Sequence, residues 1–445
     1  MRNVSASLLL LTLSFSSICF AEQNNNVDKD VDYFNTAMQM DISGDQKNAS
    51  QIYYALLQSE NTDVSIASAL TLAQKFVAAE DFQAAIKYYK WILQQEPDLS
   101  QARFELALCY MKLKRWNQAD YQLRLALAAK DLPEDAKQLM LYYRFLIKQN
   151  KNWNIWFNFG AAPDNNVNNG KGGTECINTI FGPLCQTLKE PESAVGANLS
   201  LGGTYEFTLS DQWRWKSEAN IYSNTYTNHD YDDLYLFAAT GPRYIWSRGD
   251  MWLSGIGARR WYGDKRYNWS YGAMLDTNYD FTRRLSGGLN LRFTDNTYDF
   301  YGDFLNGQTY STNIRVSYSF NSWLYTVLRT GILRESTVNP IYSYWQPSVS
   351  LGVGAEIPYG FHVYVEPSFY FSQYDDERLV VKEGNFSEIK EKDFIQRYAI
   401  SLSNNKFDIW GFVPTITVVY TRRDSNIWQQ EYDKFSAAFT LQQRF

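Results

Sequence analysis

The chain has 445 residues, enough for two or three domains, and a formal net charge of −6 that gives no sign of a nucleic-acid-binding surface. Aromatic residues make up 17% of the chain and are concentrated after Trp153. This excess favours the interfacial girdles of a membrane protein over an ordinary soluble core.

The first 21 residues have the features of a secretory signal. Arg2 precedes an apolar run from Leu8 to Phe20, and Ala21 is a small residue at the expected cleavage point. No later apolar run is long enough to cross a bilayer as a helix. We therefore expect residues 1–21 to direct export and then to be removed.

Residues 22–150 are expected to form a periplasmic helical domain, because their apolar residues recur with a helical period. Two 34-residue units overlay with Pro97 setting the register, which is the tetratricopeptide period. The equivalent positions are Leu72, Ala73, Phe76, Phe82, Ala85, Tyr89, Ile92 and Leu93, and then Leu106, Ala107, Tyr110, Trp116, Ala119, Leu123, Ala126 and Leu127. A more degenerate unit is indicated by Ala37, Met40, Gly44, Ala49, Tyr53 and Leu56. Most of these residues should pack helix against helix.

Residues 151–445 alternate apolar and polar residues in short segments up to the final phenylalanine. Between Thr309 and Phe320, one face carries aromatic and branched residues and the other carries Ser, Asn and Arg. The segment from Trp269 to Tyr279 has the same period of two, which is that of a strand. An apolar outer row against a polar inner row predicts a closed barrel with lipid outside and water inside.

The number and spacing of these segments predict an α + β protein of two domains, in which helical repeats precede a 14-stranded antiparallel transmembrane barrel. The segments begin near Trp153, Val195, Trp213, Leu234, Met251, Trp269, Leu285, Gln308, Leu324, Trp345, Phe361, Ile395, Ile409 and Lys434. Their connections alternate between long and short, which places both barrel ends on the periplasmic side. The expected long loops are residues 162–194, 224–233, 263–268, 298–307, 336–344, 374–394 and 423–433.

Two cysteines, Cys176 and Cys185, lie close together in the first long loop. An oxidising compartment favours a disulfide between them, with metal binding as the weaker alternative. Cys109 stands in an apolar helical context and is expected to be a small buried hydrophobe. The two histidines, His229 and His362, have no second ligand near them in sequence, so we expect no metal site.

Polar residues at inward-facing strand positions should make the lumen wet and mixed in charge. They are Asp276, Asn290, Arg292, Asn313, Arg315 and Arg329. A barrel of this width suggests a lumen that passes an extended chain but hardly a folded domain. Phe445 ends a row of lipid-facing residues in the last segment, and we expect it to act as a barrel assembly signal.

No catalytic constellation emerges, because the chain has no nucleophile elbow, no histidine near a candidate nucleophile and no phosphate loop. We therefore expect neither an enzyme nor a bound cofactor. The remaining function classes are transport and the anchoring of another molecule at the surface. A repeat stack offers a concave surface for other chains, so the layout suggests a pore with a docking platform at its periplasmic mouth.

The chain resembles the surface lipoprotein assembly modulators (Slam), outer-membrane proteins with a periplasmic tetratricopeptide domain before a fourteen-stranded barrel. The similarity covers essentially the whole mature sequence. Its more specific points are Pro163 to Asn168, Arg259 to Gly263 and Arg423 to Ile427. Candidate gate or loop-base residues within these segments are Asp164, Asn165, Asn166, Asn168, Arg259, Arg260, Arg423 and Asp424.

The resemblance implies an outer-membrane translocator that delivers client proteins to the cell surface. The clients would be surface lipoproteins or a secreted haem- or iron-binding protein, and further partners would be the barrel assembly machinery and periplasmic chaperones. The main alternative is an exopolysaccharide export porin, in which such repeats also precede a barrel. A nutrient porin with a helical appendage is a third alternative, but it leaves the repeats unexplained.

Overall fold

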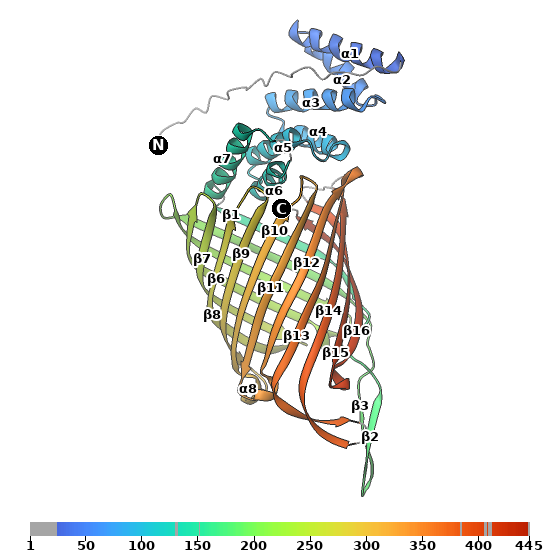
Figure 1. Ribbon diagram of the computed structural model, residues 1–445, viewed down its shortest axis with the longest axis vertical. Coiled ribbons are helices and arrows are strands. Elements are labelled where there is room, and N and C mark those ends of the chain that lie inside the picture. Colours follow the sequence, from blue (N-terminus) through green and yellow to red (C-terminus); the bar gives the residue numbers. More distant parts are fainter. Residues whose placement is uncertain are drawn as a thin grey trace. The chain divides into compact units, whose positions relative to one another are not determined.

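The computed structural model describes residues 25–129, 132–150, 152–382, 385–404, 407 and 412–443 (Figure 1). Two compact units divide the chain between Leu72 and Ala73. Each unit is described by itself. The predicted signal, residues 1–21, lies outside the described residues and stays a prediction.

The first unit contains α1 (Asn25–Ile42), α2 (Gln46–Leu56) and most of α3 (Thr62–Ala78). Gly44 has a φ of 94°, which lets the chain turn sharply between α1 and α2. The side chain of Asp45 then caps α2 by accepting from the backbone N–H of Asn48. Ala49 and Tyr53 of this degenerate unit are buried, so the earlier repeat predicted here is a helix pair.

The second unit continues with α4 (Phe82–Gln95), α5 (Ser100–Lys112), α6 (Trp116–Leu127) and α7 (Glu134–Asn150). The helices α3 to α6 follow the two predicted 34-residue units. Most overlaid positions are fully or almost fully buried, including Ala73, Ala85, Tyr89, Ile92, Leu106, Ala107, Ala119, Leu123, Ala126 and Leu127. The 34-residue period in the sequence therefore marks the residues that pack between successive helices.

Fourteen strands form one closed antiparallel barrel, in which each strand pairs with its neighbours in chain order and β1 closes onto β16 (Figure 1). The barrel strands are β1 (Trp153–Asp164), β4 (Ala194–Thr208), β5 (Trp213–Tyr226), β6 (Asp233–Trp246), β7 (Gly249–Tyr262), β8 (Lys265–Asp280), β9 (Leu285–Tyr298), β10 (Gly307–Ser319), β11 (Leu324–Thr337), β12 (Tyr344–Ile357), β13 (Phe361–Lys382), β14 (Asn385–Asn404), β15 (Phe412–Ser425) and β16 (Tyr432–Gln443). The predicted fold class is confirmed.

The two faces of the barrel wall carry the predicted residue types. Outward aromatic residues such as Trp269 and Tyr271 are more than half exposed in the protein alone, and this surface meets lipid in a membrane. Asp276 on the same strand instead bonds to Asn278 and Asn290 of the inner wall. Among the described residues, no helix is both long and apolar enough to span a membrane.

Two expectations about the extracellular connections are wrong. The loop expected from Tyr374 to Phe394 is mostly strand, because β13 runs to Lys382 and β14 starts at Asn385. Beyond the bilayer both faces of such a hairpin meet polar surroundings, so the apolar alternation disappears although the pairing continues. The loop expected from Gly263 is a two-residue turn, in which Gly263 and Asp264 both have a positive φ.

The first long loop contains a small hairpin of its own, β2 (Thr174–Thr179) and β3 (Gly182–Thr187), which forms a separate two-stranded sheet. Cys176 and Cys185 are opposite each other in this hairpin and are disulfide-bonded, as predicted. Cys109 is a buried free thiol. Phe445 lies outside the described residues, and its role in assembly stays a prediction.

We predict that the disulfide orders the β2–β3 hairpin without supporting the barrel, because this hairpin is not part of the closed sheet. Peptide mapping without reductant should recover one linked pair, Cys176 with Cys185, in the wild type and in a Cys109→Ser control. The Cys176→Ser/Cys185→Ser variant should keep the wild-type amount of heat-modifiable barrel. Free thiols at both positions, or loss of the barrel in the double variant, would contradict this assignment.

Candidate functional site

The six predicted lumen residues lie on the inner wall, but they do not meet in a single cluster. Asp276 accepts from the side-chain amide of Asn290 at 3.2 Å, and Arg315 donates to Asn278 at 2.6 Å. Arg329 reaches Tyr364 at 3.0 Å and pairs with Glu366. The two remaining predicted residues lie on neighbouring strands β9 and β10, namely Arg292, which stacks over the Phe237 ring, and Asn313, which is opposite Asn290.

These contacts link Asp276 to Asn290 and, through Asn278, to Arg315 in one network of mixed charge. Arg329 and Glu366 form a separate ion pair. Such contacts keep the interior polar without presenting a field of one sign along the wall. Among the lumen residues that the structure describes, these contacts form no focused site for a small ion of one charge.

The motif after the first strand fastens β1 to β16. Asn165 and Phe435 exchange two bonds, with the Asn165 N–H donating to the Phe435 carbonyl at 3.2 Å and the Asn165 side chain accepting from the Phe435 N–H at 2.7 Å. Asp164 accepts from Lys434 at 3.3 Å, and the buried Asn166 donates to the Asp433 carbonyl at 3.0 Å. These residues therefore close the extracellular end of the barrel seam.

Asn168 belongs to the same motif but orders the loop itself. Its side chain donates to the Glu190 carbonyl at 2.8 Å and accepts from the Gly170 and Glu192 N–H groups at 3.1 and 3.0 Å. The first strand pairs with β4 at every position from Trp153 to Asp164. The pairing with β16 is interrupted at Ala162 and Pro163, and the proline has no N–H to donate.

The two arginines at the end of β7 face opposite sides of the wall. Arg260 points inward and forms a bidentate pair with Asp233, with both distances 2.8 Å. Arg259 points outward, where it pairs with Asp299 at 2.7 Å beneath the rings of Trp261 and Trp269. Only Arg260 therefore lies where it could touch a substrate in the lumen.

Arg423 and Asp424 at the end of β15 also point to opposite sides of the barrel wall. Arg423 points inward and donates to Glu391 and Asp393 at 2.8 and 2.5 Å, and Arg378 also pairs with Glu391. These bonds hold the β13–β14 hairpin at the extracellular mouth. Asp424 points outward to Arg422 and Gln396.

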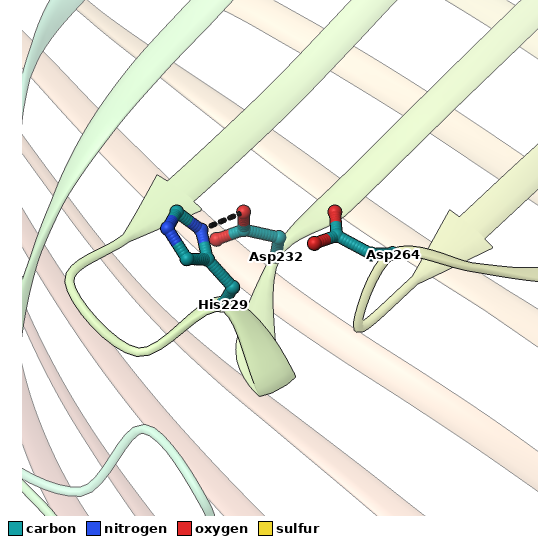
Figure 2. Close-up of side chains that lie close together, drawn as sticks. All are labelled: His229, Asp232 and Asp264. Carbon is teal, nitrogen blue, oxygen red and sulfur yellow. Dashed lines mark hydrogen bonds and ion pairs between the residues drawn. The ribbon is translucent and has the colours of Figure 1, made fainter.

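Two loops on the long-loop side bring together His229, Asp232 and Asp264 (Figure 2). One ligand atom from each lies within 4.8 Å of the others. The expectation that His229 has no second ligand near it in sequence is therefore wrong, because Asp232 follows three residues later, and the β7–β8 turn adds Asp264. His229 shares a 2.8 Å bond with Asp232, and this bond raises the pKa of the His229 imidazole. Because Asp232 also accepts from the Tyr226 N–H and His229 is exposed, the group orders the loop ends.

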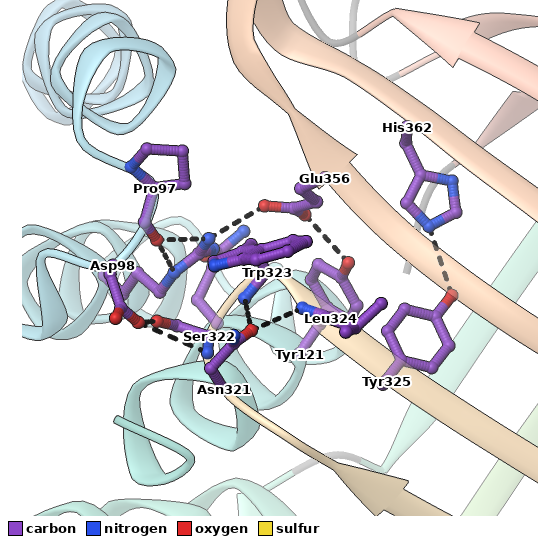
Figure 3. A network of polar contacts seen from close by, with 12 residues as sticks. Pro97, Asp98, Tyr121, Asn321, Ser322, Trp323, Leu324, Tyr325, Glu356 and His362 are labelled. Atoms are coloured by element: carbon purple, nitrogen blue, oxygen red, sulfur yellow. Dashed lines mark hydrogen bonds and ion pairs between the residues drawn. The ribbon is translucent and has the colours of Figure 1, made fainter. Parts of the chain in front are cut away.

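The short-turn end of the barrel is joined to the helical repeats by a network of polar contacts around Glu356 (Figure 3). Arg103 of α5 is fully buried and donates to the Pro97 carbonyl at 3.0 and 2.8 Å and to Gln122 at 3.0 Å. It also pairs with Glu356 at the end of β12 at 2.9 Å. The hydroxyl of Tyr121 on α6 donates to the other Glu356 oxygen at 2.8 Å.

The neighbouring barrel turn makes a second contact with the helices. Ser322 donates to Asp98 from both its backbone N–H and its hydroxyl (Figure 3). The Asn321 side chain fixes this turn by accepting from the backbone N–H groups of Trp323 and Leu324 at 3.1 and 2.8 Å. These bonds fix the shape of the turn, and the turn contacts Asp98 in the loop between α4 and α5.

A third contact lies at the last helices. Arg144 of α7 donates to Asp120 at 2.7 Å and to Asp280 of β8 at 3.1 Å. Burial opposes the charge on Arg144, but the two carboxylates outweigh it and raise its pKa. Asn117 donates to Asn154 of β1 at 2.8 Å. The helices α5 to α7 are therefore bonded to three separated parts of the barrel rim.

Sequence reasoning missed this junction. Arg103 could have been noticed, since it is a charged residue at an apolar position of a helix. Its partner could not, because Glu356 follows 253 residues later and only the barrel closure brings the two together.

The comparisons with known proteins decide the family. A family model described as surface lipoprotein assembly modifier matches residues 153–445, and one described as tetratricopeptide repeat matches residues 76–141. The chain belongs to the surface lipoprotein assembly modifier family. Since its closed barrel has the outer-membrane pattern of strands and turns, it is an outer-membrane protein whose short-turn rim faces the periplasm.

Relatives described as surface lipoprotein assembly modifiers are found in several bacteria. The protein of Pasteurella multocida is 24% identical over 395 residues, which cover 84% of this chain and 76% of the relative. That of Haemophilus influenzae is 25% identical over 370 residues, covering 79% and 72%. Among solved structures, the channel DcaP of Acinetobacter baumannii matches 66% of this chain and 97% of its own at 9% identity with a TM-score of 0.38, a likeness too low to bear on function.

We predict that Arg103→Met weakens the attachment of the helices to the barrel. Removing one partner leaves the Glu356 carboxylate largely buried without its cation, at a cost of about 3–5 kcal/mol. Urea unfolding of the helical circular dichroism signal in detergent should show the loss. Arg124→Met is the matched control, because Arg124 is half-exposed and its pair with Asp120 contributes below about 1 kcal/mol.

The double variant Arg103→Met/Glu356→Met should recover part of this loss, since it leaves no unpaired charge. Equal unfolding midpoints for wild type and Arg103→Met would show that the pair does not hold the junction.

We also predict a pH-dependent effect of Glu105, which lies in α5 beside Tyr89 and Cys109. Burial raises the pKa of the Glu105 carboxyl and, together with Glu105, raises the pKa of Cys109 to about 12. The folded chain thus holds the Glu105 proton more tightly than the unfolded chain does. The stability that this gives is present below the unfolded pKa of about 4.3 and is lost as pH rises through the folded value.

The Glu105→Gln variant should therefore unfold at a higher temperature than wild type near pH 7, and the difference should vanish near pH 4. Glu134→Gln is the control, because hydrogen bonds from Lys137 and Gln138 lower the pKa of that exposed carboxyl. It should not stabilise the helices at neutral pH. A stabilisation by Glu105→Gln that is the same at both pH values would contradict the assignment.

Proposed function

We propose that this protein delivers surface lipoproteins across the outer membrane, with the helical repeats binding the client and the barrel providing its path. The observation that carries the proposal is the direct bonding of the repeat helices to the periplasmic rim through Arg103, Asp98 and Arg144. A repeat stack is a surface for other polypeptides, and here it is fastened at the entrance of a pore.

The family supports the choice of client. Two relatives are described as surface lipoprotein assembly modifiers, and we extend the implied client class to this chain. A secreted haem- or iron-binding protein is the finer alternative within the same mechanism. We expect no catalytic step, and the barrel assembly machinery and periplasmic chaperones remain proposed partners.

The lumen is consistent with an extended client. Its wall carries separate ion pairs such as Arg329 with Glu366 and hydrogen bonds such as Arg315 with Asn278. A peptide of mixed composition can exchange hydrogen bonds with such a wall without a deep electrostatic well. The inward Arg260 and Arg423 networks lie at the extracellular end, where they order the strand ends around the exit.

We predict that deleting residues 25–61, which contain α1 and α2, reduces surface exposure of a co-produced client lipoprotein by about tenfold or more. The deletion removes the helix pair α1 and α2 but keeps the contacts of α5 to α7 with the barrel rim. Protease shaving of intact cells measures the client, and heat modifiability confirms the barrel. The Arg124→Met variant serves as the control with an intact stack.

Three outcomes are informative. Unchanged client exposure with the deletion would contradict docking by the repeats. Unchanged exposure in cells without the protein would contradict translocation. Loss of an extracellular polysaccharide without change in the client would favour the exopolysaccharide exporter.

A further inference from the structure

The outer surface of the barrel has a cleft of about 830 Å³ at its extracellular end, on the wall formed by β12 to β15. Its floor is aromatic, with Trp345, Phe371 and Phe394 contributed by three adjacent strands. Phe371 and Phe394 stack at 4.7 Å between ring centroids. These side chains occupy the outward positions of their strands, so the cleft faces the membrane and not the lumen.

We infer that the cleft lies at the level of the lipid head groups along the membrane normal. Toward the periplasmic end the outward positions change from aromatic, as at Phe369 and Tyr398, to aliphatic, as at Val365 and Ile400, which are exposed on the lipid-facing surface. An aromatic belt followed by charged residues marks the interface of a membrane barrel. A ligand in the cleft would therefore be a lipid of the outer leaflet.

The arginines and the lysines at this level differ in whether they form ion pairs. The outward arginines each have a carboxylate partner: Arg259 has Asp299, Arg334 has Asp375, and Arg422 has Asp424. Lys390 and Lys392 line the same cleft, and both are exposed. Within the part of the chain that the structure describes, neither lysine side chain forms an ion pair, although Lys390, after Arg334, contributes to lowering the pKa of the Asp375 carboxyl.

The two lysines are held in place by their backbone. The Asn426 side chain donates to the Lys390 carbonyl at 2.8 Å and accepts from the Lys392 N–H at 2.8 Å. The two residues lie two positions apart on one face of β14, a Cα spacing of roughly 7 Å. The facing position on β13 is Glu377 for Lys390 and the uncharged Gln373 for Lys392.

We propose that this cleft binds a phosphorylated lipid of the outer leaflet. Lys390 and Lys392 would contact the phosphate, and the Trp345, Phe371 and Phe394 rings would pack against the upper part of the acyl chains. Two lysines fixed above an aromatic floor match a head group that carries negative charge directly above hydrocarbon. This site is separate from the lumen and does not depend on what the lumen transports.

The test uses the full chain in phosphatidylcholine nanodiscs, titrated with diphosphorylated lipid A and followed by native mass spectrometry. Wild type should retain one lipid A molecule, and Lys390→Gln/Lys392→Gln should lower the apparent affinity by about tenfold or more. Lys390→Arg/Lys392→Arg should retain binding. The charge-matched control is Lys189→Gln/Lys265→Gln, which alters two exposed lysines outside the cleft and should bind as wild type does.

Competition with other lipids tests whether the phosphate head group or the acyl chains determine binding. Phosphatidylglycerol at the same concentration should compete less well, and a dephosphorylated lipid A should fail to bind. Equal binding by wild type and Lys390→Gln/Lys392→Gln would overturn the proposal. So would preferential binding of a triacylated lipopeptide, which would make the cleft a site for a client's lipid anchor. Heat modifiability of each variant confirms that the barrel compared is folded.

Discussion

The bilayer interior offers no hydrogen-bond partner to a backbone N–H or C=O group, and this constraint determines the main architecture of the protein. A sheet can satisfy it only by closing, so β1 must meet β16 and every strand must have two neighbours. Closure then separates an outer surface exposed to lipid from an inner surface that can be polar. The alternation of residue types along each strand is the direct consequence.

Closure also explains why the first and last strands carry special residues. Pro163 interrupts the pairing of β1 with β16, yet Asn165 and Asn166 restore hydrogen bonds to the backbone of β16 just beyond it. The segment from Pro163 to Asn166 therefore fastens the seam of the barrel. Arg423 has a comparable role on the neighbouring pair of strands, because it bonds β15 to β14 on the inner wall at the extracellular end.

Ion pairs to the barrel rim fix the position of helices α5 to α7. A buried ion pair costs desolvation and is a weak source of net stability, but it strongly disfavours any other arrangement that would leave one charge unpaired. Arg103 with Glu356, and Arg144 with Asp120 and Asp280, thus define where the helices sit on the rim. The surface proposed to bind the client is thereby held at the short-turn rim of the barrel.

Much of this was determined by the sequence alone, because periodicity records what each face of an element touches. The period of two revealed the fourteen strands, and the 34-residue period revealed the helix pairs whose residues Tyr89 and Leu123 are buried at equivalent positions. The close spacing of Cys176 and Cys185 was enough for the disulfide. Periodicity failed where β13 and β14 leave the bilayer, since neither face of that hairpin is then required to be apolar. Only the tertiary structure decided that Arg259 and Asp424 face outward, that Asn165 and Asn166 fasten the seam, and that Arg103 meets Glu356. Each of these contacts joins residues whose partners are chosen by strand register and barrel closure, and no local pattern in the chain records them.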